Sequence, residues 1–412
     1  MTEAVQPPLR ESHWHEHGLV AGVSLAHFIS HFYFMVLPPL FLFIRSDYNV
    51  SYTELGLVLS VFSTVSTIFQ TPVGFLVDRT GPRANLIGGL LLGGASLVVV
   101  GLSDSYWMLV AMFGVLGLAN TVFHPADYAM LSHHVPAQRI ARAFSVHTFS
   151  GLLGGAVAPA TLLFLQLYVG WRGAIIAAGL LGLIGAVILM LQRDPPLVQV
   201  ARPKEDESAR PSGWQLLTSR PMLLNLVFFF LVSTIASGLT NYLVVALIDL
   251  QNAPVAVANT ALSTIMFASA VGVLLGGLIL TRTRRHVGLT YITLSVIGTV
   301  SLIVAYVSLD AAALIVMMIL SGLASGVMSP SRDMMVRDIT PPGSFGAVFG
   351  FLSNGFSLSG IVSPLLFGFL MDHGQARYVF VVVAASCLLC ALAVTAVARS
   401  GPARSLPDPS PR

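Results

Sequence analysis

Apolar runs long enough to cross a membrane cover nearly the whole sequence. A spanning helix needs roughly 20 mostly apolar residues. Of the 412 residues, 55% are hydrophobic and only 9% are charged, whereas a soluble domain carries about 25% charged residues. Because lipid admits only helices or closed barrels, runs this continuous predict an all-α integral membrane protein. The twelve predicted spans are 18–44, 52–77, 84–103, 107–131, 140–168, 172–191, 221–248, 255–280, 287–308, 310–335, 343–370 and 376–398.

Basic residues gather in alternate loops between these spans. The basic loops hold Arg79, Arg83, Arg139, Arg142, Arg282, Arg284, Arg285 and Arg337. The opposite side has only Arg45, Arg172 and Arg377. Because cytoplasmic loops are enriched in Lys and Arg, we expect a multi-pass protein of the bacterial cytoplasmic membrane with both termini inside the cell. The net charge of +3 reflects this bias and does not indicate a nucleic-acid partner.

One polar stretch divides the spans into six and six. The segment RDPPLVQVARPKEDESARPSGW is rich in Pro and in both charge signs, which is typical of a linker. The predicted parts are a cytoplasmic tail (1–17), a six-helix bundle (18–191), a cytoplasmic linker (192–220), a second bundle (221–399) and a second tail (400–412).

The two halves resemble each other in sequence. A shift of 205 residues places GLANTVFHPADYAML over GLASGVMSPSRDMMV, so that Pro125 matches Pro330 and Pro159 matches Pro364. An ungapped match over two spans and a loop indicates a duplicated bundle. Parallel repeats of this kind build transporters that bind substrate between the repeats, near the midplane of the membrane.

The loop between the second and third spans carries a recognisable motif. GFLVDRTGPR resembles the GxxxD(R/K)xG(R/K) motif of the major facilitator superfamily, with Gly74, Asp78, Arg79, Gly81 and Arg83 at the matching positions. We expect Gly74 to permit close helix packing, and the two arginines to pair with Asp78 or with lipid headgroups. The resemblance implies two pseudo-symmetric six-helix bundles that work by alternating access, as a functional monomer.

Within that superfamily, the first half is similar to the fosmidomycin-resistance group of drug exporters. The similarity rests on SLAHFISHF, SYTELGL, QTPVGFLVD and VFHPADYA. The chain departs from that group at Ala126 and His31, where the group tends to have acidic residues. The superfamily resemblance also implies that spans one, four, seven and ten line the central cavity.

His27 and His31 lie four residues apart, and therefore on one face of the first span. A histidine takes up a proton near neutral pH, which suits coupling to a proton gradient. Two alternatives remain open: the HxxxH spacing also suits a metal pair, and both rings could simply bond to neighbouring helices.

Asp127 and Arg332 occupy equivalent positions in the repeat, with opposite charges. We predict that they pair and close the cytoplasmic side, since pairing offsets the cost of burying either charge. Asp333 is a competing partner for Arg332, and separate solvation of each charge is the alternative. Arg332 could also bind an anionic substrate, because guanidinium suits carboxylate and phosphonate, with His124 and His147 as further donors.

Other polar and helix-bending residues complete the candidate set. Asn225, Asn241 and Asn354 are cavity candidates whose alternative role is interhelical hydrogen bonding. Prolines 125, 159, 330 and 364 are predicted helix bends. The glycine-rich stretch GLLGGAVAP is similar to patterns in antiporters, and helix packing would equally explain its glycines. Cys387 and Cys390 are interpreted as packing residues.

The sequence therefore predicts a proton-coupled exporter of a small anionic or amphipathic compound. An importer of small organic anions is the nearest alternative, and a divalent-metal transporter or a non-transporting receptor ranks below it. The partners expected are a small-molecule substrate and membrane lipid. Because we find no nucleotide-binding loop, nucleophile motif or metal constellation of normal spacing, no enzyme activity and no cofactor are expected.

Overall fold

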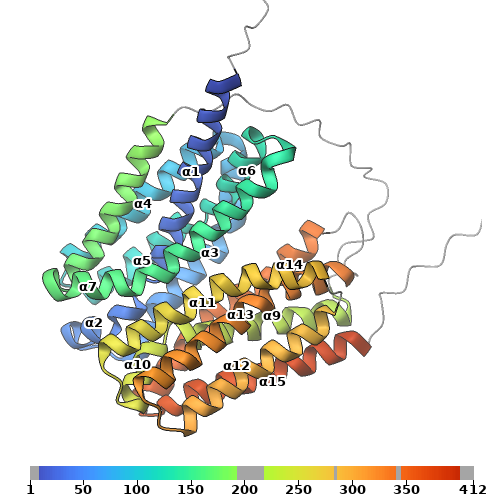
Figure 1. Ribbon diagram of the computed structural model, residues 1–412. Helices are drawn as coiled ribbons and strands as arrows, with labels where there is room; N and C mark the ends of the chain where they lie inside the picture. The colour runs from blue at the N-terminus through green and yellow to red at the C-terminus, as the bar shows by residue number, and fades with distance from the viewer. Residues whose placement is uncertain (1–8, 193–217, 283–284, 340–344, 400–412) are drawn as a thin grey trace, which may run out of the picture. The chain divides into compact units, whose positions relative to one another are not determined.

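The computed structural model describes residues 9–192, 218–282, 285–339 and 345–399, and in these ranges every regular element is helical (Figure 1). The predicted linker and C-terminal tail lie almost wholly outside the described residues. The described helices cluster into two compact units. Unit 1 ends in the linker region and also takes the first part of α11 (Val255–Phe267), and unit 2 holds the remainder.

Unit 1 is built from the first half of the chain. Its helices are α1 (Leu9–Phe34), the short 3-10 helix η1 (Pro38–Leu40), α2 (Phe41–Tyr48), α3 (Tyr52–Thr80), α4 (Pro82–Leu102), α5 (Tyr106–Asn120), α6 (Phe123–His134) and α7 (Ala137–Leu191). Within it, α1 and α4 both pack along α7, and α1 also contacts α6.

Unit 2 is built from the second half. Its helices are α9 (Arg220–Thr240), α10 (Leu243–Gln251), the part of α11 (Val255–Arg282) that follows Phe267, α12 (His286–Tyr306), α13 (Ala311–Ile339), α14 (Phe345–Asp372) and α15 (Ala376–Arg399). Here α9 packs against α14 and α15, while α12 packs against α13 and α15.

Among the described residues, eleven helical stretches are long and apolar enough to cross a membrane. Twelve were predicted, and the difference lies in α7, where the 50 residues from Arg142 to Leu191 count as one apolar stretch. Gly170 interrupts it with φ 69° and ψ 172°, a conformation outside the helical region. The two sides of this break correspond to the predicted spans 140–168 and 172–191, so the all-helical membrane fold is confirmed.

The first and seventh spans are interrupted in similar ways. The first breaks after Phe34 and resumes as α2, and the seventh breaks after Thr240 and resumes as α10. Both resumed helices end at an asparagine with φ 51°, Asn49 and Asn252. Asparagine tolerates this left-handed conformation better than most residues. Each unit thus has a broken first span that ends at a left-handed asparagine, and the two asparagines are separated by nearly the spacing of the sequence repeat.

The glycine-rich stretch of α7 lets α1 approach closely. A Cβ built on Gly151 would lie 2.5 Å from Cε1 of His27, and one built on Gly154 would collide with the carbonyl of Phe28. Beside them, the Ser150 hydroxyl donates to the carbonyl of Ser24 at 2.8 Å. Helix packing therefore accounts for two of the glycines in GLLGGAVAP.

We expect Gly154→Ala to destabilise unit 1, because the added methyl group meets rigid backbone. Overpacking of this kind costs about 1–3 kcal/mol. Gly88→Ala in α4 is the matched control, because a Cβ there meets no atom within 4 Å and the change gains up to about 1 kcal/mol of helix propensity. The measurement is thermal unfolding of the detergent-purified variants. Equal melting temperatures for the two variants would contradict the packing argument.

Candidate functional site

The fourth span breaks just before its proline. α5 ends at Asn120 and α6 begins at Phe123, with Pro125 in the first turn of α6. Since proline has no N–H, the carbonyl of Thr121, four residues earlier, receives no helical bond from it. The side-chain amide of Gln70 in α3 lies 3.5 Å from that carbonyl. Prolines 159, 330 and 364 lie inside continuous helices, and bending there stays a prediction.

Asp127 lies in α6 with its carboxylate fully buried. His147 of α7, itself 1% exposed, donates from Nε2 to Oδ2 of Asp127 at 3.0 Å. The other carboxylate oxygen, Oδ1, has no hydrogen-bond partner among the described residues. We call Asp127 and His147 the buried pair. A buried carboxylate with one unmatched oxygen is costly as an anion, so this arrangement suits a group that exchanges a proton.

His27 of α1 stacks on the imidazole of His147, with ring centroids 3.9 Å apart and the rings parallel within 1°. Its Nδ1 lies 2.8 Å from the backbone carbonyl of His147. Because a carbonyl only accepts, Nδ1 of His27 must carry the proton, and Nε2 keeps a free lone pair. That Nε2 is buried and has no partner in the described part of the chain.

His31 and His124 complete a histidine cluster with His27. The ring centroid of His27 lies 4.6 Å from that of His31 and 5.5 Å from that of His124. One nitrogen from each of the three rings lies within 4.8 Å of the other two. The structure thus brings together five of the residues singled out from the sequence, on three helices of unit 1.

Arg332 is the charged candidate of unit 2. It pairs with the adjacent Asp333, with Nη2 and Oδ1 2.8 Å apart, and its side chain is 17% exposed. Its guanidinium carbon lies 5.1 Å from the ring centroid of Phe229 and 5.2 Å from that of Phe356. Cation–π contacts of this kind restrict the position of the guanidinium group. The two phenylalanines were missed by sequence reasoning, because nothing in the pattern separates them from the other apolar residues of their spans.

Asp127 and Arg332 each have a charged or titratable partner inside their own unit. The predicted gate pair between them therefore stays a prediction, and the competing Asp333 contact is present.

The asparagine candidates make local contacts. Asn225 donates to the carbonyl of Pro221 at 2.9 Å, and Asn241 donates to the hydroxyl of Ser237 at 3.3 Å. Each of these bonds is made within α9 or at its end, in place of the interhelical bonds expected. Asn354 lies exposed on α14.

The loop motif between α3 and α4 is a backbone turn. Gly81 ends α3 with φ 90°, a conformation that favours glycine. Arg83 donates to the carbonyls of Leu189 and Gln192 at the end of α7, a role not expected from the sequence. Arg79 is exposed, and the side chain of Asp78 lies outside what the structure describes. A Cβ built on Gly74 meets no described atom within 4 Å, and the close packing expected there stays a prediction.

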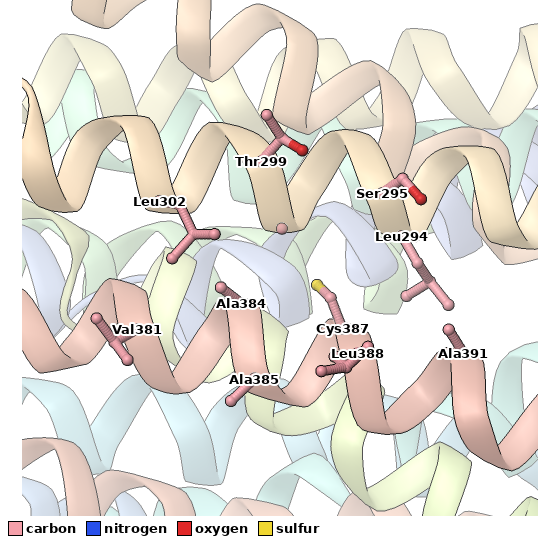
Figure 2. Close-up of a pocket in the computed structure, with 11 residues that line it drawn as sticks. Leu294, Ser295, Thr299, Leu302, Val381, Ala384, Ala385, Cys387, Leu388 and Ala391 are labelled. Carbon is pink, nitrogen blue, oxygen red and sulfur yellow. The ribbon is translucent and has the colours of Figure 1, made fainter.

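A separate pocket of about 470 Å³ lies between α12 and α15 of unit 2 (Figure 2). Leu294 and Leu302 extend from α12 toward α15, and the sulfur of Cys387 points back toward α12. Its lining is apolar apart from Ser295, Thr299 and this thiol. Cys387 and Cys390 are both free and buried. This pocket lacks charged groups, and the candidate site remains the histidine cluster, the buried pair and Arg332.

A family model for the Major Facilitator Superfamily matches residues 23–252 and 231–412. A probable L-galactonate transporter of Escherichia coli is 30% identical over 144 residues, which cover 35% of this chain and 32% of that protein. The chain thus aligns with about a third of that relative's length. A probable sulfoacetate transporter of Cupriavidus necator is 26% identical, over 80% of this chain and 81% of its own. A D-galactonate transporter of Escherichia coli is 23% identical, over 85% and 87%.

Solved structures show the same fold. A bacterial homologue of the human lysosomal transporter Spinster, in an inward-facing and occupied conformation, superposes with a TM-score of 0.76 at 17% identity, covering 96% of this chain and 98% of that one. The nucleoside transporter NupG gives a TM-score of 0.76 at 14% identity, covering 92% and 99%.

Proposed function

Since the chain belongs to the Major Facilitator Superfamily, we propose that it is a secondary transporter that moves a small organic anion by alternating access, driven by a proton gradient. The observation that carries the proton coupling is the carboxylate of Asp127, fully buried in a membrane-spanning stretch beside His147. An ionisable group at such a position is expensive to keep and marks a functional site by default.

Asp127 is the proposed proton carrier, and His147 is its positioning partner. With a proton on Oδ1, the carboxyl group is neutral, and its burial costs less than burial of the anion. Without it, the anion is held by the single hydrogen bond from His147. A change in exposure during the transport cycle would therefore change proton affinity, which is the coupling that a proton-driven transporter needs.

Arg332 is the proposed anion-binding residue of unit 2. Its planar guanidinium, fixed over two phenylalanine rings, presents donors in the fork geometry that matches carboxylate and phosphonate. The names of three relatives support an acidic substrate, since they refer to L-galactonate, sulfoacetate and D-galactonate. The first-half similarity to the fosmidomycin-resistance group adds phosphonates to the candidate ligands.

Proteoliposomes test the proposal and its direction together. Uptake of labelled sugar acids, sulfonates and a phosphonate is measured with the pH gradient imposed inward or outward. Movement of anion and proton in the same direction supports the importer, and movement in opposite directions supports the exporter predicted from the sequence. Transport that ignores the gradient would remove the proton coupling, and transport of neutral sugars alone would remove the anion.

Exchange of charges tests the predicted gate pair. If Asp127 and Arg332 close the cytoplasmic side, then Asp127→Arg combined with Arg332→Asp recovers the transport that each single variant loses. If Asp127 acts instead through His147, the double variant stays inactive, because the new arginine lies against His147 with no carboxylate to carry a proton. Initial uptake rates of the three variants decide between the two roles.

A further inference from the structure

We infer that His27, His31 and His124 form a binding site for a transition-metal ion such as Zn²⁺. The three side chains come from α1 and α6 of the same unit, and one nitrogen of each lies within 4.8 Å of the others. In a tetrahedral zinc site, imidazole nitrogens lie about 2.0–2.1 Å from the metal and therefore about 3.4 Å from one another. Small side-chain rotations close that difference.

His27 is already arranged as a metal ligand. Metal-binding histidines commonly donate the other ring N–H to a backbone carbonyl, which fixes the tautomer and the ring orientation. His27 makes this contact through Nδ1 to the carbonyl of His147. Its Nε2 is therefore the nitrogen that keeps a lone pair for a metal, and among the described residues that atom is buried without a partner. His27 is only 4% exposed, so a metal ion bound at Nε2 would supply the partner that this buried atom lacks.

The exposure of the other two histidines provides access. His27 is buried, His31 is half-buried and His124 is exposed, so an ion can enter over His124 and reach His27 last. The stacked ring of His147 and the backbone carbonyl of the same residue hold the His27 ring in place, and Gly151 leaves room for it. The position of His27 is thus fixed by its contacts, whereas the exposed ring of His124 is free to adjust to a bound ion.

The donor set selects the class of metal. Three imidazoles suit zinc, copper, nickel or cobalt, whereas magnesium and calcium require oxygen ligands. Three protein ligands also leave a fourth tetrahedral position open for water or an anion. A bound ion would join α1 to α6 beside the break between α5 and α6. Binding itself does not depend on the proposed transport activity.

Cobalt titration of the purified full-length protein tests the site. Co²⁺ reports tetrahedral coordination through its visible absorption, and Zn²⁺ should displace it. The N-terminal histidines His13, His15 and His17 are replaced by alanine in a parallel background, so that weak binding there is removed. We expect one Co²⁺ per chain in both backgrounds, without the charge-transfer band that thiolate ligation by Cys387 or Cys390 would give.

The variants are His31→Ala and His124→Ala, each of which should weaken Co²⁺ binding at least about tenfold. His133→Ala, an exposed histidine on the same helix α6, is the matched control and should bind as the parent does. Thermal unfolding without metal confirms that each variant folds, and His31→Asn replaces His31→Ala if the latter does not. Absence of tetrahedral Co²⁺, or binding unchanged in both cluster variants, overturns the inference.

Discussion

Replacing Asp127 with asparagine should reduce proton-driven transport to the level of empty liposomes. The amide has nearly the same shape and can still accept a hydrogen bond from His147, so the buried contact seen at 3.0 Å is kept. What the variant loses is the ability to ionise. Transport by a carrier that must release a proton in each cycle would stop, whereas exchange of substrate between two pools at equal pH, which needs no net proton movement, should continue.

The comparison of these two assays separates a proton carrier from a merely structural residue. Asp249→Asn serves as the control, because this carboxylate is exposed on α10 and should leave both assays unchanged. Loss of exchange together with driven transport would mean that Asp127 is needed for folding or for substrate binding. Full driven transport in Asp127→Asn would reject it as the carrier.

Sequence reasoning located the charged and titratable residues of unit 1 but not their pairing. His27, His124 and Asp127 stand out because polar side chains are rare in apolar spans. Their partners depend on which helix faces fit together, and that follows from glycines such as Gly151, whose importance only appears when α1 is seen against it. The repeat pointed to Arg332 as the partner of Asp127, which stays a prediction. Nothing in the sequence pattern signals the contact that Asp127 makes within unit 1, with His147 of the neighbouring span.

The breaks within the spans could not be predicted from the hydropathy of the sequence. Hydropathy reports whether a stretch is apolar, and it does not respond to a local change of backbone direction. The first span was therefore expected to continue through Phe34, where the structure breaks it before η1. Near Pro125 the proline gave a local signal, since a missing N–H leaves an unmatched carbonyl, and there the break lies a few residues upstream, as the structure shows.

Replacing Arg332 with alanine should raise the substrate concentration for half-maximal transport by about 10–100-fold. Hydrogen bonds to charged groups contribute about 1.5–3 kcal/mol, and each 1.4 kcal/mol corresponds to about tenfold in affinity. Arg332→Lys keeps the charge but loses the planar fork, and it also loses part of the contact with Phe229 and Phe356. Its half-saturation value should therefore fall between those of the parent and the alanine variant.

Two control variants accompany the Arg332 substitutions. Arg377→Ala removes an arginine that lies over the ring of Tyr306 and should leave anion affinity unchanged. Asp333→Asn removes the carboxylate that now pairs with Arg332, so the guanidinium becomes available and affinity for the anion should hold or rise. If Arg332→Ala lowers the maximal rate with half-saturation unchanged, the residue acts in the conformational cycle. In that case the ion pair with Asp333 would be the functional contact of Arg332, and it would break and form again as the transporter changes conformation.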